Sequence, residues 1–432
     1  MKRGWISIVL PAVLAGAAAG VQRFDLPEFK SDYRLPPTQT PYPRASWMEF
    51  VDLVLLLAAL SVASWLALKK RSRRWIYVLM VSSLLYFGFY RQGCVCPIGA
   101  IQNVAYALFH PAYVIPVVVL AFFVAPLVFA LAFGRAFCAA VCPLGAIQDV
   151  VAVKPVNVPG WLAHALGLLA YVYLACAVLF AATGATFIIC QYDPFVSFFR
   201  VSGTLNMLIL GACFLVIGLF VARPYCRFLC PYGALLRLVS GASRLRVTIT
   251  PQECIKCRLC EDSCPFGAIL KPTPEQQAVP RAEGKGRLAG LILLLPVLVA
   301  MGGWLGWSLG EPFSRMHYTV RLADRVYQEK TGQVQGTTDA SAAFYATDRL
   351  VEELYQEARD IRAGFARAAV ATGAFVGLVI GLKLVQLSMR RRRTEYEADR
   401  GTCLACGRCF TYCPIEHRRR KQLHDRSPVR RV

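Results

Sequence analysis

The sequence predicts an all-α polytopic membrane protein with about eight transmembrane helices and a small α+β domain on the cytoplasmic side. Three observations lead to this fold class. The 432 residues are 56% apolar with a mean hydropathy of +0.47, which is too hydrophobic for a soluble globule. Several apolar segments approach the roughly 20 residues needed to cross a bilayer. The 17 cysteines fall mostly in regularly spaced groups, which favours metal binding over a disulfide framework.

The apolar segments and the positive charges together predict a topology. The segments lie near 4–20, 48–68, 75–90, 111–133, 161–183, 204–222, 288–309 and 365–388. The first is interpreted as a signal peptide or an anchor, and both place residue 21 outside. The basic runs at 69–74 and 390–393 mark cytoplasmic ends. The inside then holds 69–74, 134–160, 223–287 and 389–432, and the outside holds 21–47, 91–110, 187–203 and 310–364.

This topology accounts for the net charge of +22 without a nucleic-acid partner, because the basic runs adjoin apolar segments. It also divides the chain into five parts. They are an N-terminal anchor or signal segment with an external linker (1–47), a transmembrane core (48–245), the first half of the α+β domain (246–287), a transmembrane hairpin with an external helical insert at 310–364 (288–388), and the second half of that domain with a basic tail (389–432).

The cytoplasmic domain is predicted from two copies of Cys-x-x-Cys-x-x-Cys-x-x-x-Cys-Pro, the spacing of bacterial-type ferredoxins that bind two [4Fe–4S] clusters. The copies are Cys254, Cys257, Cys260, Cys264 and Cys403, Cys406, Cys409, Cys413. In such domains the fourth cysteine serves the other cluster. We therefore expect one site of Cys254, Cys257, Cys260 and Cys413, and another of Cys403, Cys406, Cys409 and Cys264. Residues 246–251 alternate like the strand that opens such a domain. Zinc or disulfides are the competing interpretation.

A shorter motif, Cys-x-x-x-Cys-Pro followed by Gly-Ala, occurs twice at predicted membrane edges. The cysteines are Cys138 and Cys142 in one copy and Cys226 and Cys230 in the other. On a helix, cysteines at i and i+4 share a face, so each pair can present two thiolates together. Both pairs are expected inside, where the four thiolates form a candidate third iron–sulfur site. A structural or reactive cysteine pair, or another metal, is the alternative.

Three further cysteines, Cys94, Cys96 and Cys190, are expected on the outer side. They are candidates for an outer redox relay. The alternatives are a disulfide between two of them, which an oxidising exterior permits, or inert residues in a packed corner.

These residues resemble the membrane-bound polyferredoxins of the NosR/NapH group, through the two Cys-x-x-x-Cys-Pro loops, the ferredoxin motifs and the Cys190-Gln-Tyr-Asp-Pro-Phe loop. The resemblance covers roughly 75–420. It implies that Cys138, Cys142, Cys226 and Cys230 are the membrane-edge cysteines of the group and that the eight ferredoxin cysteines are cluster ligands. Unlike NosR, only a short stretch precedes the second apolar segment here. The Thr183-Gly184-Ala185-Thr186 stretch is similar to the motif that receives covalent FMN in related redox membrane proteins, but the acidic residue upstream in that motif is absent here. Covalent FMN at Thr186 is therefore not favoured.

The resemblance implies an iron–sulfur electron-transfer protein in the bacterial cytoplasmic membrane. It would pass electrons between a quinol or cytoplasmic donor and an exported or membrane partner, for which an external flavin- or haem-bearing protein is a natural choice. A redox-sensing regulatory factor, or a maturation factor for an exported metalloenzyme, is the alternative. The motifs indicate an electron-transfer subunit rather than a stand-alone catalyst. Cluster potentials range over roughly −700 to +450 mV, so both directions of electron flow stay open.

Overall fold

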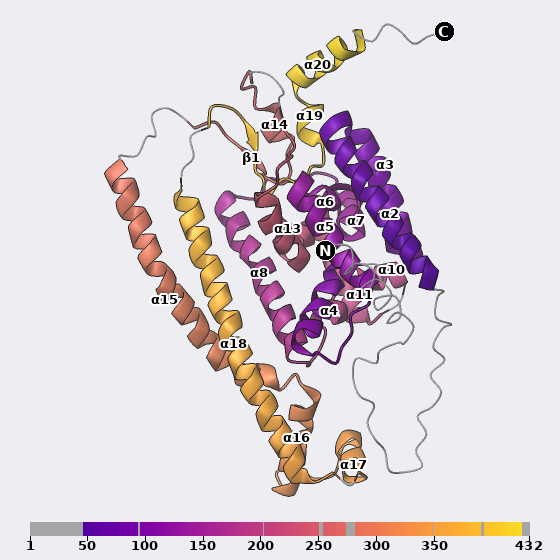
Figure 1. The fold of residues 1–432 in the computed structure, drawn as a ribbon, viewed down its shortest axis with the longest axis vertical. Coiled ribbons are helices and arrows are strands. Elements are labelled where there is room, and N and C mark those ends of the chain that lie inside the picture. The colour runs from indigo at the N-terminus through magenta and orange to yellow at the C-terminus, as the bar shows by residue number, and fades with distance from the viewer. Residues whose placement is uncertain are drawn as a thin grey trace, which may run out of the picture.

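The computed structural model describes residues 46–93, 96–201, 203–249, 254–273, 281–347, 349–389 and 393–425. The predicted first segment at 4–20 and Cys94 lie outside these residues. The chain is a bundle of helices with the ferredoxin-motif segments at one end and the helices α16 and α17 at the other (Figure 1).

Four helices of the described part are long and apolar enough to cross a membrane. They are α2 (Ser46–Trp65) with its π-helical continuation η2 (Leu66–Lys70), α8 (Gly160–Ala182), α15 (Arg281–Ser314) and α18 (Val351–Ser388). Two shorter apolar helices, α5 (Val117–Phe133) and α11 (Leu205–Phe220), lie among them. The chain is thus a helical membrane protein, and the count of eight spans stays a prediction.

The remaining predicted segments correspond to irregular or shortened helices. The segment at 75–90 is α3 (Arg73–Ser83), which continues as a π-helix, η3 (Leu84–Tyr90). The segment expected at 111–133 becomes helical only at Val117, because Pro116 takes the N-cap position in an extended conformation. Proline lacks the N–H that a helix interior needs and disfavours a helical residue before it, so the chain up to Pro116 stays irregular.

Short helices follow the three Cys-Pro steps that precede the first ferredoxin motif. They are α4 (Pro97–Phe109), α7 (Pro143–Val151) and α13 (Pro231–Gly241), each with proline at its first position. Proline suits this position because the first N–H of a helix has no intrahelical partner. Four shorter helices join the bundle: α6 (Ala136–Ala140), α9 (Ile188–Gln191), α10 (Val196–Arg200) and α12 (Pro224–Phe228).

The helices α15 and α18 form a hairpin that packs through small residues (Figure 1). A Cβ placed on Gly306 would lie 2.1 Å from the carbonyl oxygen of Ala369, and one on Gly373 would lie 2.1 Å from that of Gly302. Glycines four residues apart therefore let the two backbones touch, as in small-xxx-small packing of membrane helices. The 38 residues of α18 span about 57 Å, well beyond the roughly 30 Å of a hydrocarbon core.

The N-terminal part of α18 extends into a small helical unit with α16 (Tyr318–Lys330) and α17 (Asp339–Tyr345). Its own apolar cluster includes Val320, Val326, Phe344 and Leu354. These buried side chains give residues 310–364 a small apolar core of their own, separate from that of the main helix bundle.

The ferredoxin-motif segments meet at the opposite end. A two-stranded antiparallel sheet pairs β1 (Ile269–Leu270) with β2 (Glu397–Ala398), so the two halves are joined although the α15–α18 hairpin separates them in sequence. Short helices α14 (Leu259–Asp262), α19 (Arg408–Thr411) and α20 (Pro414–Asp425) complete this region.

The strand expected over 246–251 does not form within its described part, 246–249. The Arg71 guanidinium donates to the carbonyls of Thr248, at 2.7 Å, and Ile249, at 2.9 Å. A side chain from the membrane bundle thus takes the place that a neighbouring strand would occupy.

Candidate iron–sulfur centres

The structure contains three small cavities that are each lined by four cysteines. We call them the first, second and membrane-edge cavities. Cys254, Cys257, Cys260 and Cys413 line the first. Cys264, Cys403, Cys406 and Cys409 line the second. Cys138, Cys142, Cys226 and Cys230 line the membrane-edge cavity. Each set therefore combines cysteines from segments that lie far apart in the sequence.

The first two cavities take three cysteines from one motif and the fourth from the other. Cys264 leaves its own motif and lines the second cavity, while Cys413 lines the first. The β1–β2 pairing brings the two halves close enough for this exchange, since Ile269 stands opposite Ala398. This is the spatial arrangement that crossed ligation would require.

The loops around these two cavities share one backbone conformation. Lys256 and Arg258 have φ of 53° and 65°, and the equivalent Ala405 and Gly407 have φ of 57° and 80°. Three of these four residues are not glycine, so the left-handed conformation is costly and must be imposed by the surroundings. Turns that alternate with left-handed residues direct backbone N–H groups inward and form concavities that bind anions, including iron–sulfur clusters.

The membrane-edge cavity has a near-symmetric construction. Arg135 stands three residues before Cys138, and Arg223 stands three residues before Cys226. Each arginine reaches the other motif. A Cβ on Gly145 would lie 3.0 Å from Nη1 of Arg223, and one on Gly233 would lie 3.5 Å from Nη2 of Arg135. The Gly of each Cys-Pro-x-Gly step thus leaves room for the arginine of the opposite repeat.

The expected helical i, i+4 geometry of these cysteine pairs is wrong in detail. Cys138 lies in α6, but Cys142 is the N-cap of α7, and Cys226 and Cys230 are divided in the same way between α12 and α13. Proline after the second cysteine ends one helix and starts the next. The two cysteines of each pair nevertheless line the same cavity.

Several sulfur atoms accept hydrogen bonds. Gly233 N–H donates to Sγ of Cys230 at 3.2 Å, and Nε2 of Gln148 donates to Sγ of Cys226 at 3.2 Å. In the second cavity, Ala405 N–H donates to Sγ of Cys403 at 3.4 Å. Such bonds favour thiolates and are one of the means by which a protein tunes cluster potentials.

Burial acts against free thiolates at these sites. It raises the pKa of the Cys403 thiol to about 12 and that of the Cys260 thiol to about 11. Without a bound cation these thiols are therefore protonated at neutral pH. A metal must displace their protons, which couples metal binding to proton release.

The donor sets fit iron–sulfur clusters. All potential ligands in the three cavities are thiols, and thiolates select zinc or iron–sulfur clusters. Within the described residues, no three His, Cys, Asp or Glu side chains are placed to hold a single metal ion. A four-iron cluster fills the space between its thiolates and keeps them further apart than one ion would.

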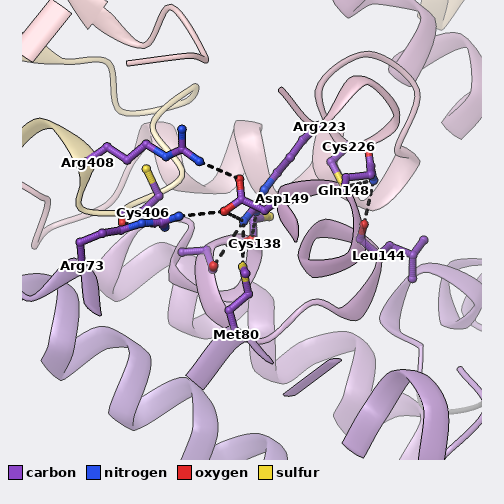
Figure 2. A network of polar contacts seen from close by, with 11 residues as sticks. Arg73, Met80, Cys138, Leu144, Gln148, Asp149, Arg223, Cys226, Cys406 and Arg408 are labelled. Carbon is purple, nitrogen blue, oxygen red and sulfur yellow. Dashed lines mark hydrogen bonds and ion pairs between the residues drawn. The ribbon is translucent and has the colours of Figure 1, made fainter. Parts of the chain in front are cut away.

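A buried ionic network lies between the membrane-edge and second cavities (Figure 2). At its centre, Asp149 on α7 pairs with Arg73 at 3.0 Å, Arg223 at 3.3 Å and Arg408 at 3.4 Å. Burial by itself would raise the pKa of the Asp149 carboxyl, but the three guanidinium groups outweigh it and hold the pKa well below its usual range. The carboxylate therefore stays charged.

This network was not predicted from the sequence. Two signals were available to find it. Asp149 is the only acidic residue between 134 and 160, and an arginine stands three residues before the first cysteine of both Cys-x-x-x-Cys-Pro motifs.

The other residues singled out from the sequence, Cys96, Cys190 and Thr186, do not line any of the three cavities. Cys96 is the N-cap of α4, and Ile98 of the same helix lines the membrane-edge cavity. A Cβ on Gly99 would lie 3.4 Å from Sγ of Cys190, so Cys190 packs against the first turn of α4. The Thr186 hydroxyl donates to Oε1 of Gln191 at 3.0 Å. Whether these cysteines form a relay stays a prediction.

Comparison with known families gives two matches, both to models described as 4Fe–4S binding domains. One matches residues 93–116, 115–168 and 204–250, which include Cys96 and all four cysteines of the membrane-edge cavity. The other matches residues 247–270, which contain the first ferredoxin motif.

Individual relatives share parts of this chain. YccM of Escherichia coli K12, a protein named for electron transport, is 28% identical over 193 residues, which are 39% of this chain and 52% of YccM. The uncharacterised protein MJ0750 of Methanocaldococcus jannaschii is 28% identical over 191 residues, or 42% of this chain and 77% of that protein. Protein NirI of Paracoccus denitrificans is 30% identical over 148 residues, or 31% of this chain and 21% of NirI. No solved structure matches.

Proposed function

We propose that the chain is a membrane-bound polyferredoxin of the NosR/NapH type, and that it carries electrons between a quinol or cytoplasmic donor and an exported or membrane redox partner. The 4Fe–4S family models and the relatives YccM and NirI support this proposal. The observation that carries this proposal is the set of three cavities, each lined by four cysteines. Iron–sulfur clusters bound there would supply one-electron redox chemistry. The chain itself would provide the ligands, the hydrogen bonds to sulfur and the charges around them.

The proposed ligands are the twelve cysteines of the three cavities. Crossed ligation by Cys264 and Cys413 is supported by the cavities that these residues line. A third cluster on Cys138, Cys142, Cys226 and Cys230 is supported by their shared cavity and by the family model that covers both motifs. Zinc is disfavoured because both matching family models describe 4Fe–4S binding domains.

The proposed orientation places the first and second cavities on the cytoplasmic side of the inner membrane. The basic residues Lys69 to Arg74 support it, since they lie at the end of α2 near the ferredoxin segments. The unit of α16, α17 and the start of α18 would then face outside. It is a proposed docking surface for a flavin- or haem-bearing partner, and Cys94, Cys96 and Cys190 are the proposed outer relay.

Electron transfer by proteoliposomes tests this function. The purified protein is reconstituted with quinol, and reduction of an impermeant dye on each side is followed anaerobically. We expect turnover by the wild type, its loss in Cys406→Ser, and its retention in Cys213→Ser. Cys213 is the matched control because it is exposed on the apolar helix α11 and is not among the residues that line the three cavities. Redox-active clusters without turnover with any donor would favour a sensing or maturation role instead.

A further inference from the structure

Arg223 is buried between the membrane-edge cavity and the second cavity. Its side chain is 1% exposed, and Arg223 is the N-cap residue of α12, which begins at Pro224. The guanidinium donates to the carbonyl of Cys138 and, at 3.4 Å, to that of Ala139. On its other side it pairs with Asp149 and lies 5.9 Å from the ring centroid of Phe266. Cys138 lines the membrane-edge cavity and Phe266 lines the second.

The walls of the two cavities are in contact. Cys138 packs against the apolar cluster of Ala222, Cys264, Phe266, Ala268 and Leu404, and Cys403 and Cys406 pack against the same cluster. Arg73 extends the contact, since its Nη1 donates to the carbonyl of Cys406 at 3.1 Å while its Nη2 binds Asp149. Figure 2 shows Cys138, Arg223, Asp149, Arg73 and Cys406 in one connected group.

The network carries excess positive charge. Three arginines surround one carboxylate, and Asp149 and Arg223 are both 1% exposed. Charges in such a water-poor region interact more strongly than at the surface. Added electrons make an iron–sulfur site more negative, so a fixed positive charge between two sites favours the reduced state of both.

The first cavity is served by a different arginine. Arg71 donates to the carbonyl of Ile249, a residue of that cavity, and pairs with Glu416, which follows the cavity residue Ile415. The charge of Arg223 thus lies beside the membrane-edge and second cavities and not beside the first.

We propose that Arg223, held by Asp149, is a positioning residue that couples the membrane-edge cavity to the second cavity, so that electrons enter or leave the ferredoxin domain through the second cavity. In each step one electron leaves the reduced site and enters the oxidised one, and no bond or proton changes place. This inference rests on the proposed third cluster. It adds the order of the sites and the group that links them.

Potentiometric titration followed by electron paramagnetic resonance tests the inference, with dithionite as reductant. Arg223→Gln removes a positive charge and should shift the reduction potentials of the membrane-edge and second sites downward, with no shift at the first site. Asp149→Asn removes a negative charge and should shift the same two potentials upward. Arg223→Lys keeps the charge and should restore most of the wild-type values. Arg244→Gln is the matched control, because it removes the same charge from an exposed position.

The opposite signs separate electrostatic coupling from structural damage, which would lower occupancy without moving two potentials in opposite directions. Either Arg223→Gln or Asp149→Asn suffices if the other fails to fold. The inference is overturned if three clusters are present and both potentials stay at their wild-type values, or if all three sites shift equally. If iron content is unchanged when Cys138 and Cys226 are both replaced by serine, the third cluster is wrong. The proposed coupling through Arg223 is then wrong as well, because it requires a cluster in the membrane-edge cavity.

Discussion

Nε of Arg71 lies 3.1 Å from Oε1 of Glu416, and this buried ion pair joins the end of the first described membrane helix to α20 beside the first cavity. Glu416 also pairs with Arg419 at 2.9 Å. The same Arg71 binds the carbonyls that precede the first ferredoxin motif. One side chain of the membrane bundle therefore holds both halves of the ferredoxin domain.

Glu416→Ala should release this attachment. It leaves Arg71 buried without its carboxylate partner, and breaking a buried pair on one side costs on the order of 3–5 kcal/mol. We expect a lower thermal unfolding midpoint and loss of the first cavity's cluster signal before that of the membrane-edge cavity. Glu353→Ala, at an exposed position on α18, is the control and should behave as wild type. An unchanged midpoint in Glu416→Ala would show that the pair does not hold the domain.

Single cysteine variants test the crossed ligand sets. Cys264→Ser should damage the cluster of the second cavity, and Cys413→Ser that of the first, since each residue lines the cavity of the other motif. Electron paramagnetic resonance spectra of the reduced variants identify which cluster signal is lost. The references are Cys257→Ser, which changes the first cavity, and Cys406→Ser, which changes the second. The fused-domain account is wrong if Cys264→Ser and Cys257→Ser lose the same signal.

Asp149 should stabilise the protein to the same extent across the ordinary pH range. Its folded-state pKa is depressed below that of the unfolded chain, so its contribution is complete above the unfolded value and is lost only as pH falls through the folded value, in strong acid. Asp149→Asn should therefore lower stability by on the order of 3 kcal/mol, equally at pH 5.5 and pH 8. Thermal unfolding at several pH values measures this. A difference that disappears between pH 8 and pH 5.5 would contradict an ionised, arginine-paired carboxylate.

Gly306→Leu should destabilise the α15–α18 hairpin, because a Cβ at this position meets the carbonyl of Ala369 and the helices must separate. Overpacking of this kind costs about 1–3 kcal/mol or more. Gly290→Leu in the same helix is the matched control, since a Cβ there meets nothing within 4 Å. Unfolding midpoints in detergent give the comparison. Equal midpoints for the two variants would refute close glycine packing.

Cysteine spacing predicted which loops face one another, because a cluster needs four thiolates and each motif spacing is stereotyped. Apolar length predicted α2, α8, α15 and α18, which are long enough to be recognised without tertiary context. The start of α5 was placed too early because Pro116 delays the helix. The strand predicted over 246–251 is wrong within 246–249, because the Arg71 guanidinium binds the carbonyls of Thr248 and Ile249. The Asp149 network depends on contacts between residues up to 259 positions apart, such as Arg408 with Asp149, which no local pattern encodes.

The central claim is that this chain holds iron–sulfur clusters in three cysteine cavities. Iron and acid-labile sulfide counted on anaerobically purified protein, with zinc measured on the same sample, test it most directly. We predict about twelve irons and twelve sulfides per chain, from three four-iron clusters, falling to about eight of each when Cys138 and Cys226 are both replaced by serine. A count of about eight in the wild type would refute the membrane-edge cluster, and protein loaded with zinc and free of sulfide would contradict the whole account.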